Sequence, residues 1–155
     1  MQNGKGNNTF LNMADVINEI KNWHQFTEKF GEEYQMHDAV IKRFDWNGDE
    51  LIVIVNTLYE MDDDKVYDIT LKFSNLIRFN FQPEIGNDFI YGIEVKKNDY
   101  YKNLYEFVFD GVILTIECFN IELLSITESE PFQRGMIWLE EPNQTPDSGK
   151  RMFRT

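Results

Sequence analysis

Apolar residues near the N-terminus of the chain recur at the spacing of one helical face. Most of them lie three or four positions apart, which is the period of an amphipathic helix. The residues on this stripe are Met13, Val16, Ile17, Ile20, Trp23 and Phe30. Asn12 suits a helix N-cap, and Gly31 suits a helix end. The pattern therefore predicts one helix over Met13–Phe30, after a flexible polar tail at residues 1–12.

From Asp38 onward, apolar and polar residues alternate with a period of two, as they do in half-buried strands. Asn47-Gly48 and Asp110-Gly111 each separate two alternating segments, and such pairs are typical of tight β-hairpins. About eight short segments show this alternation, which predicts a meandering antiparallel sheet.

The two patterns together predict an α+β fold in a single domain over residues 13–140. The N-terminal helix is expected to pack its apolar stripe on a mainly antiparallel meandering sheet of about six to eight strands. Burying each large side chain of the stripe would contribute ~1.5–3 kcal/mol. After Pro131 the alternation fades, so residues 141–155 are expected to form a flexible tail.

The charge of the chain narrows the choice of partners. The sequence has 27 acidic and 15 basic residues, for a net charge of −12. Such a protein repels nucleic acid and anionic membranes and favours a basic partner, although solubility alone explains the acidity equally well. A single cysteine excludes an internal disulfide. No signal peptide or membrane-length apolar run is visible, so a cytoplasmic protein is expected.

The adjacent residues His37 and Asp38 raise the question of metal chemistry, because some metal-dependent hydrolases use such a pair. A metal site normally needs three or four ligands. The only other histidine, His24, lies inside the predicted helix. The pair is therefore expected to fix the corner between helix and first strand by hydrogen bonds to the backbone.

Other catalytic patterns find no support in the sequence. Asp45–Glu50 resembles the start of a calcium loop, but Glu50 occupies the position that requires glycine. Cys118 shares the apolar parity of its segment, which predicts a buried and unreactive thiol. No phosphate-binding loop or nucleophile elbow occurs. We therefore expect no enzyme activity, no metal and no cofactor.

Three segments resemble a family of bacterial immunity proteins that accompany polymorphic toxins, namely the immunity protein fifty family. These are "MHDAVI", "YDITLKFSNLIRFNF" and "YEFVFDGVILTIECFNIELLSI", and the resemblance covers Tyr34–Thr127. It implies a non-enzymatic protein that binds and neutralises a cognate protein toxin, for example a basic nuclease. It supplies no catalytic residues.

Candidate residues for binding such a toxin are of two kinds. Four acids lie on the polar parity of successive strands, and three tyrosines are suited to anchor an interface, as Tyr59 and Trp46 also are. The seven candidates are Asp68, Glu94, Tyr100, Tyr101, Tyr105, Glu106 and Glu117. Lys72 and Arg78 share the polar face, so its charge is mixed. The alternative is a curved sheet-plus-helix pocket that binds a small molecule, with hydrolase-like or isomerase-like activity. The oligomeric state is left open.

Overall fold

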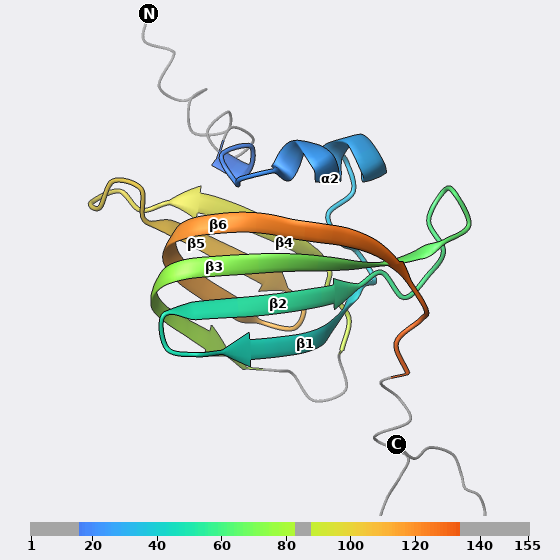
Figure 1. Cartoon of the computed structure of the whole chain (residues 1–155). Coiled ribbons are helices and arrows are strands. Elements are labelled where there is room, and N and C mark those ends of the chain that lie inside the picture. The colour runs from blue at the N-terminus through green and yellow to red at the C-terminus, as the bar shows by residue number, and fades with distance from the viewer. Residues whose placement is uncertain (1–15, 83–87, 134–155) are drawn as a thin grey trace, which may run out of the picture.

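The computed structural model describes residues 16–82 and 88–133, which form one short helix and a six-stranded antiparallel sheet (Figure 1). The elements are α2 (Trp23–Phe30), β1 (Val40–Trp46), β2 (Glu50–Asn56), β3 (Val66–Phe81), β4 (Gly92–Lys97), β5 (Tyr105–Asp110) and β6 (Leu114–Ser129). The strand order is β1-β2-β3-β6-β5-β4. The antiparallel sheet and the α+β class are confirmed. The tails expected at residues 1–12 and 141–155 lie outside the described residues.

Two of the strands are far longer than the alternation predicted. β3 and β6 each contain 16 residues, and each joins two segments that the sequence presented as separate strands. In the region where the two predicted segments of β3 meet, the pairing between β3 and β6 is irregular. Its register shifts between Leu76 and Arg78. The nearby Asn75 has a φ of 52°. An irregularity of this kind changes which residues face the core without ending the strand. About eight expected segments therefore form six strands.

The continuous helix predicted over Met13–Phe30 is wrong in its described part, because α2 begins only at Trp23. Asn22 takes a left-handed conformation with a φ of 69° and interrupts the helix. Just before it, the Lys21 amide donates to the Ile121 carbonyl at 3.0 Å, and the Lys21 carbonyl accepts from the Leu123 amide at 2.9 Å. The backbone of Lys21 therefore pairs with β6, and no continuous helix runs through this position. The first expected turn, from Met13, lies outside the described residues.

Helix α2 packs one face against the sheet. Trp23 of the predicted stripe is buried and Phe30 is half-buried. Phe26, which is not part of the predicted stripe, is also buried and stacks on Trp23 with ring centroids 4.2 Å apart. The facing strand side chains follow the expected parity of β3: Tyr67, Ile69, Leu71 and Phe73 are all buried. No helix among the described residues is long and apolar enough to cross a membrane.

The two edges of the sheet approach each other at one corner, where the chain leaves α2 and enters β1. Val40 forms an isolated antiparallel bridge with Phe89, just ahead of β4. The Asp38 amide donates to the Ile90 carbonyl, and the Ile90 amide donates to the Ala39 carbonyl, both at 2.8 Å. The sheet is consequently strongly curved (Figure 1).

The His-Asp pair lies at this corner. Asp38 has a φ of 68°. The His37 side chain is exposed, and its Nδ1 lies 3.2 Å from the Tyr91 carbonyl oxygen. Within residues 16–82 and 88–133, no group of three or more His, Cys, Asp or Glu side chains is arranged to hold a metal ion.

Candidate functional site

Two of the candidate acids, Glu106 and Glu117, face each other across β5 and β6 on the outer surface of the sheet. Like charges in this position repel each other. Each is compensated by a cation on the adjacent strand. Lys96 lies 3.4 Å from Glu106, and Arg78 forms a double hydrogen bond to Glu117 at 3.0 and 3.2 Å. The cross-strand row Lys96–Glu106–Glu117–Arg78 therefore carries no net charge.

The other two candidate acids do not extend this row into an acidic face. Glu94 is exposed on β4, but its neighbour across the strands is the uncharged Val108. Asp68 lies in the other half of β3 and is mostly buried, with 16% of its side chain exposed. It accepts hydrogen bonds from the Lys42 ammonium at 2.6 Å and from the Asn56 amide at 2.8 Å. Asp68 is thus committed to contacts within the sheet.

Tyr100 and Tyr101 project into solvent from the connection between β4 and β5, with exposed fractions of 89% and 64%. Their backbone is held in place by the Asn98 side chain, whose Oδ1 accepts from both amides, at 2.7 and 3.0 Å. We call residues 98–104 the tyrosine turn. Lys102 and Asp99 of this turn are both exposed, and the flanking Lys96 and Lys97 are paired with Glu106 and Glu19, so the charges around the turn are mixed.

Tyr105, the third candidate tyrosine, faces the opposite side of the sheet from Glu106. It is half-buried, and its hydroxyl donates to the Glu19 carboxylate at 2.6 Å. Burial and this bond raise the pKa of Tyr105 to about 12. The bonds from Tyr105 and Lys97 in turn lower the pKa of Glu19. The hydrogen bond from Tyr105 therefore connects the start of β5 to the segment that precedes α2.

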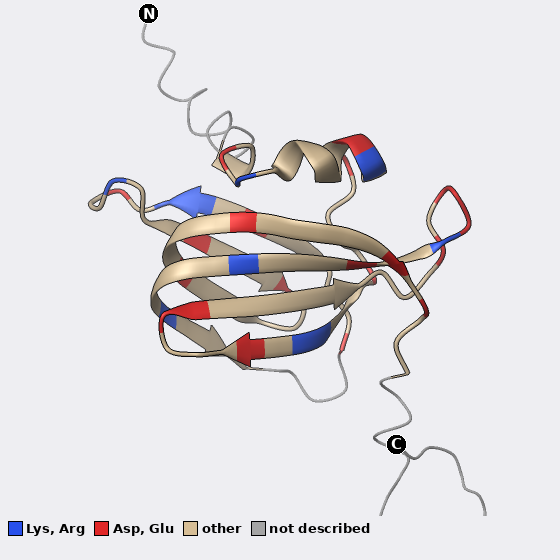
Figure 2. Ribbon diagram, viewed as in Figure 1, with Lys and Arg blue, Asp and Glu red and all other residues tan. Residues whose placement is uncertain are grey.

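A different acidic surface lies at the other end of the molecule, on the loop that joins β2 to β3 (Figures 1 and 2). We call residues 57–65 the acidic loop. Tyr59 is 56% exposed there, next to the exposed acids Glu60, Asp62 and Asp64. None of these three forms an ion pair with any residue that the structure describes. The sequence showed the acids of this loop, but not that they gather around an exposed tyrosine at one end of the sheet.

Hydrogen bonds fix the conformation of the acidic loop. The Met61 amide donates to the Lys65 carbonyl at 2.9 Å, and the Asp64 amide donates to the Met61 carbonyl at 2.8 Å. Asp63 joins the loop to its surroundings, because it pairs with Lys29 of α2 at 3.1 Å and accepts from the Tyr67 hydroxyl. These bonds, that of Tyr67 above all, lower the pKa of Asp63. Tyr59 is therefore displayed from an ordered loop.

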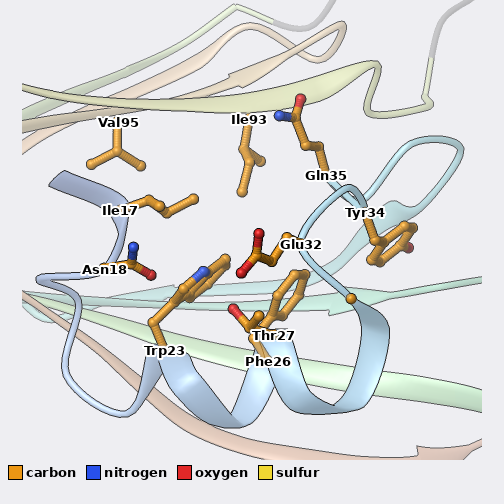
Figure 3. Close-up of a pocket in the computed structure, with 11 residues that line it drawn as sticks. Ile17, Asn18, Trp23, Phe26, Thr27, Glu32, Tyr34, Gln35, Ile93 and Val95 are labelled. Atoms are coloured by element: carbon orange, nitrogen blue, oxygen red, sulfur yellow. The ribbon is translucent and has the colours of Figure 1, made fainter. Parts of the chain in front are cut away.

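A cleft with a volume of about 310 Å³ opens between α2 and β4 (Figure 3). Its apolar walls come from Trp23 and Phe26 on the helix and from Ile93 and Val95 on the strand. Its polar lining comes from Asn18, Thr27, Glu32 and Gln35, and Ile17, Gly31 and Tyr34 complete it. We call it the α2–β4 cleft. It is the kind of pocket that the small-molecule alternative requires.

The chain matches no protein-family model, no curated protein and no solved structure. The resemblance to immunity proteins therefore rests on the residues of the sequence alone. The function is inferred below from the charge and exposure of the surfaces described above.

Proposed function

We propose that this protein is an immunity protein that binds a cognate protein toxin and blocks it without catalysing a reaction. The observation that carries the proposal is the acidic loop, where exposed Tyr59 stands among three acids that have no ionic partner in the described part of the chain. This surface has both properties expected of a site for a basic partner, namely negative charge and an aromatic anchor.

The two kinds of residue would act on different steps of binding. Unpaired acids attract a basic surface from a distance and speed the encounter. A tyrosine that becomes buried in the complex supplies contact area and slows dissociation. Because hydrogen bonds already order the loop, little conformational entropy is lost on binding. A toxin with a basic cleft, such as a nuclease, fits this chemistry.

The tyrosine turn is the competing contact surface on the same molecule. Tyr100 and Tyr101 are more exposed than Tyr59, but the charges near them are mixed and largely paired. A basic partner is therefore attracted more strongly at the acidic loop, where three acids have no ionic partner among the described residues. Tyr100 is thus a matched control, since it is an exposed tyrosine on an ordered turn at the opposite end of the sheet (Figure 1).

The experiment first searches the neighbouring genes for a toxin domain, and then combines growth rescue with binding kinetics for that domain. Tyr59→Ala is expected to raise the dissociation rate about 30-fold, which corresponds to ~2 kcal/mol for a true hot spot. The double variant Asp62→Asn, Asp64→Asn is expected to slow association, and added salt should have the same effect on the unaltered protein. Tyr100→Ala should leave both rates unchanged.

Two results would count against the proposal in different ways. If Tyr100→Ala weakens the complex and Tyr59→Ala does not, the function stands but the tyrosine turn is the contact surface. If growth is not rescued and no complex forms at micromolar concentration, the immunity function itself is wrong.

A further inference from the structure

Beyond toxin binding, we propose that the α2–β4 cleft binds a small organic cation: a protonated amine carried on one flat apolar ring. The proposal rests on three features of the cleft, which are the shape of its walls, the charge at its mouth and its size.

The walls form a slot suited to a flat apolar group. On the α2 side, Trp23 and Phe26 stack with an interplanar angle of 17°, and Tyr34 continues the stack at 5.8 Å from Phe26. On the other side lie Ile93 and Val95 of β4, which are 2% and 1% exposed. Trp23, Phe26, Ile93 and Val95 are almost fully buried and form the inner surface of the cleft, and the half-buried Ile17 and Tyr34 supply its more exposed apolar lining. A ring inserted against this lining would exchange water for apolar contacts.

The charge of the cleft is negative and is concentrated in one residue. Among the described residues that line the cleft, Glu32 alone is charged, and its carboxylate points into the space between the walls (Figure 3). Among the described residues it forms no ion pair and no hydrogen bond. An ammonium group would therefore supply a partner that the described residues do not, in a charge-assisted contact.

The end of α2 places this carboxylate. The Gly31 amide closes the last turn by donating to the Thr27 carbonyl at 2.8 Å, and Gly31 then takes a φ of 89°. Combined with its ψ of 166°, this φ lies in a region of backbone conformation that essentially only glycine adopts. It turns the chain back across the end of the helix, so that Glu32 and Gln35 lie at the mouth of the cleft.

The size limits the ligand. A volume of about 310 Å³ lies at the lower end of the range for small-molecule pockets. It accommodates a single aromatic ring with a short aminoalkyl chain. None of the described residues that line the cleft is basic, so an anionic ligand would find no counter-charge among them.

The test compares two probes of nearly the same shape, phenethylammonium and the neutral 2-phenylethanol. Each is titrated into the full-length protein, and the indole N–H of Trp23 is followed by NMR. Phenethylammonium is expected to shift this signal saturably and to bind at least about tenfold more tightly than the alcohol, as an added charge-assisted contact requires. Glu32→Gln should abolish that preference.

Glu33→Gln is the matched control, because Glu33 is the next residue, is also exposed and is not among the residues that line the cleft. It should bind phenethylammonium as the unaltered protein does. Equal binding of the two probes, equal loss in both variants, or no shift of the Trp23 signal at ~10 mM amine would each overturn the proposal. The toxin takes no part in this measurement, so its outcome is independent of the immunity function.

Discussion

Asn56 of β2 and Asp68 of β3 lie directly opposite each other, and the Asn56 amide donates to the Asp68 carboxylate at 2.8 Å. Asn56 is fully buried. Its amide also donates to the Glu130 carbonyl at 3.0 Å, and its carbonyl oxygen accepts from the amides of Leu58 and Phe132. One side chain therefore joins two strands, the start of the acidic loop and the chain that follows β6.

Replacing Asn56 with alanine is expected to lower the free energy of unfolding by about 3 kcal/mol, because several buried partners lose their hydrogen bonds at once. Urea denaturation monitored by circular dichroism measures this change. Asn80→Ala is the control, since Asn80 is exposed and should change stability by less than ~0.5 kcal/mol. Similar losses in the two variants would show that Asn56 has no such joining role.

The two hairpin glycines should differ in their tolerance of a side chain. Gly48 and Gly111 have similar φ values, 101° and 98°, so alanine is strained at both positions. A Cβ at Gly48 would meet nothing within 4 Å, whereas one at Gly111 would lie 2.5 Å from the Phe89 carbonyl oxygen. We expect Gly48→Ala to cost ~1–2 kcal/mol and Gly111→Ala at least ~2 kcal/mol more. Equal midpoints in urea would contradict this expectation.

The thiol of Cys118 should be unreactive in the folded protein. It is fully buried, and burial raises its pKa to about 12, so almost no thiolate exists at pH 8. A chromogenic disulfide reagent is expected to label no thiol in native buffer and one thiol per chain in guanidinium chloride, because the sequence contains one cysteine. Rapid labelling without denaturant would mean that β6 opens readily.

Acidification should weaken the folded state partly through Glu19. The hydrogen bonds from Tyr105 and Lys97 lower the pKa of Glu19 from its ordinary value of 4.5. A lowered pKa in the folded state contributes stability that is present above the unfolded value and is lost as the pH falls through the folded value. The stability difference between the unaltered protein and Glu19→Gln should therefore shrink below pH 4.5. Tyr105→Phe should raise the Glu19 pKa in a carboxyl NMR titration, and an unchanged pKa would exclude this role for Tyr105.

The features that were predicted correctly from the sequence depend on residues close together along the chain. Asn47-Gly48 and Asp110-Gly111 do connect antiparallel neighbours, because a tight turn needs only its own residues to set the pairing of the flanking strands. The burial of alternate residues in β3 was likewise readable, since the period of two follows directly from strand geometry. What failed depends on distant partners: α2 begins only at Trp23 because Lys21, just ahead of it, pairs with β6.

The candidate site was predicted only in part, for the same reason. The parity of Glu106 and Glu117 placed them correctly on the outer face, but the cations that neutralise them lie on other strands. Asp68 also has outward parity, yet Lys42 and Asn56 enclose it. The tyrosine turn and the acidic loop lie at opposite ends of the sheet because of the order in which the strands pair. The alternation of apolar and polar residues does not reveal that order.

The pairing between Lys21 and β6 sets the order in which the protein can assemble during synthesis. Asn22 and Leu123, which belong to this junction, are 101 positions apart. The segment that carries Trp23 and Phe26 leaves the ribosome long before β6 is made, so α2 stays without its contacts to β6 until almost the whole chain has emerged. Docking of α2 is thus a late event, and a nascent or truncated chain that ends before β6 exposes an aromatic surface that chaperones recognise.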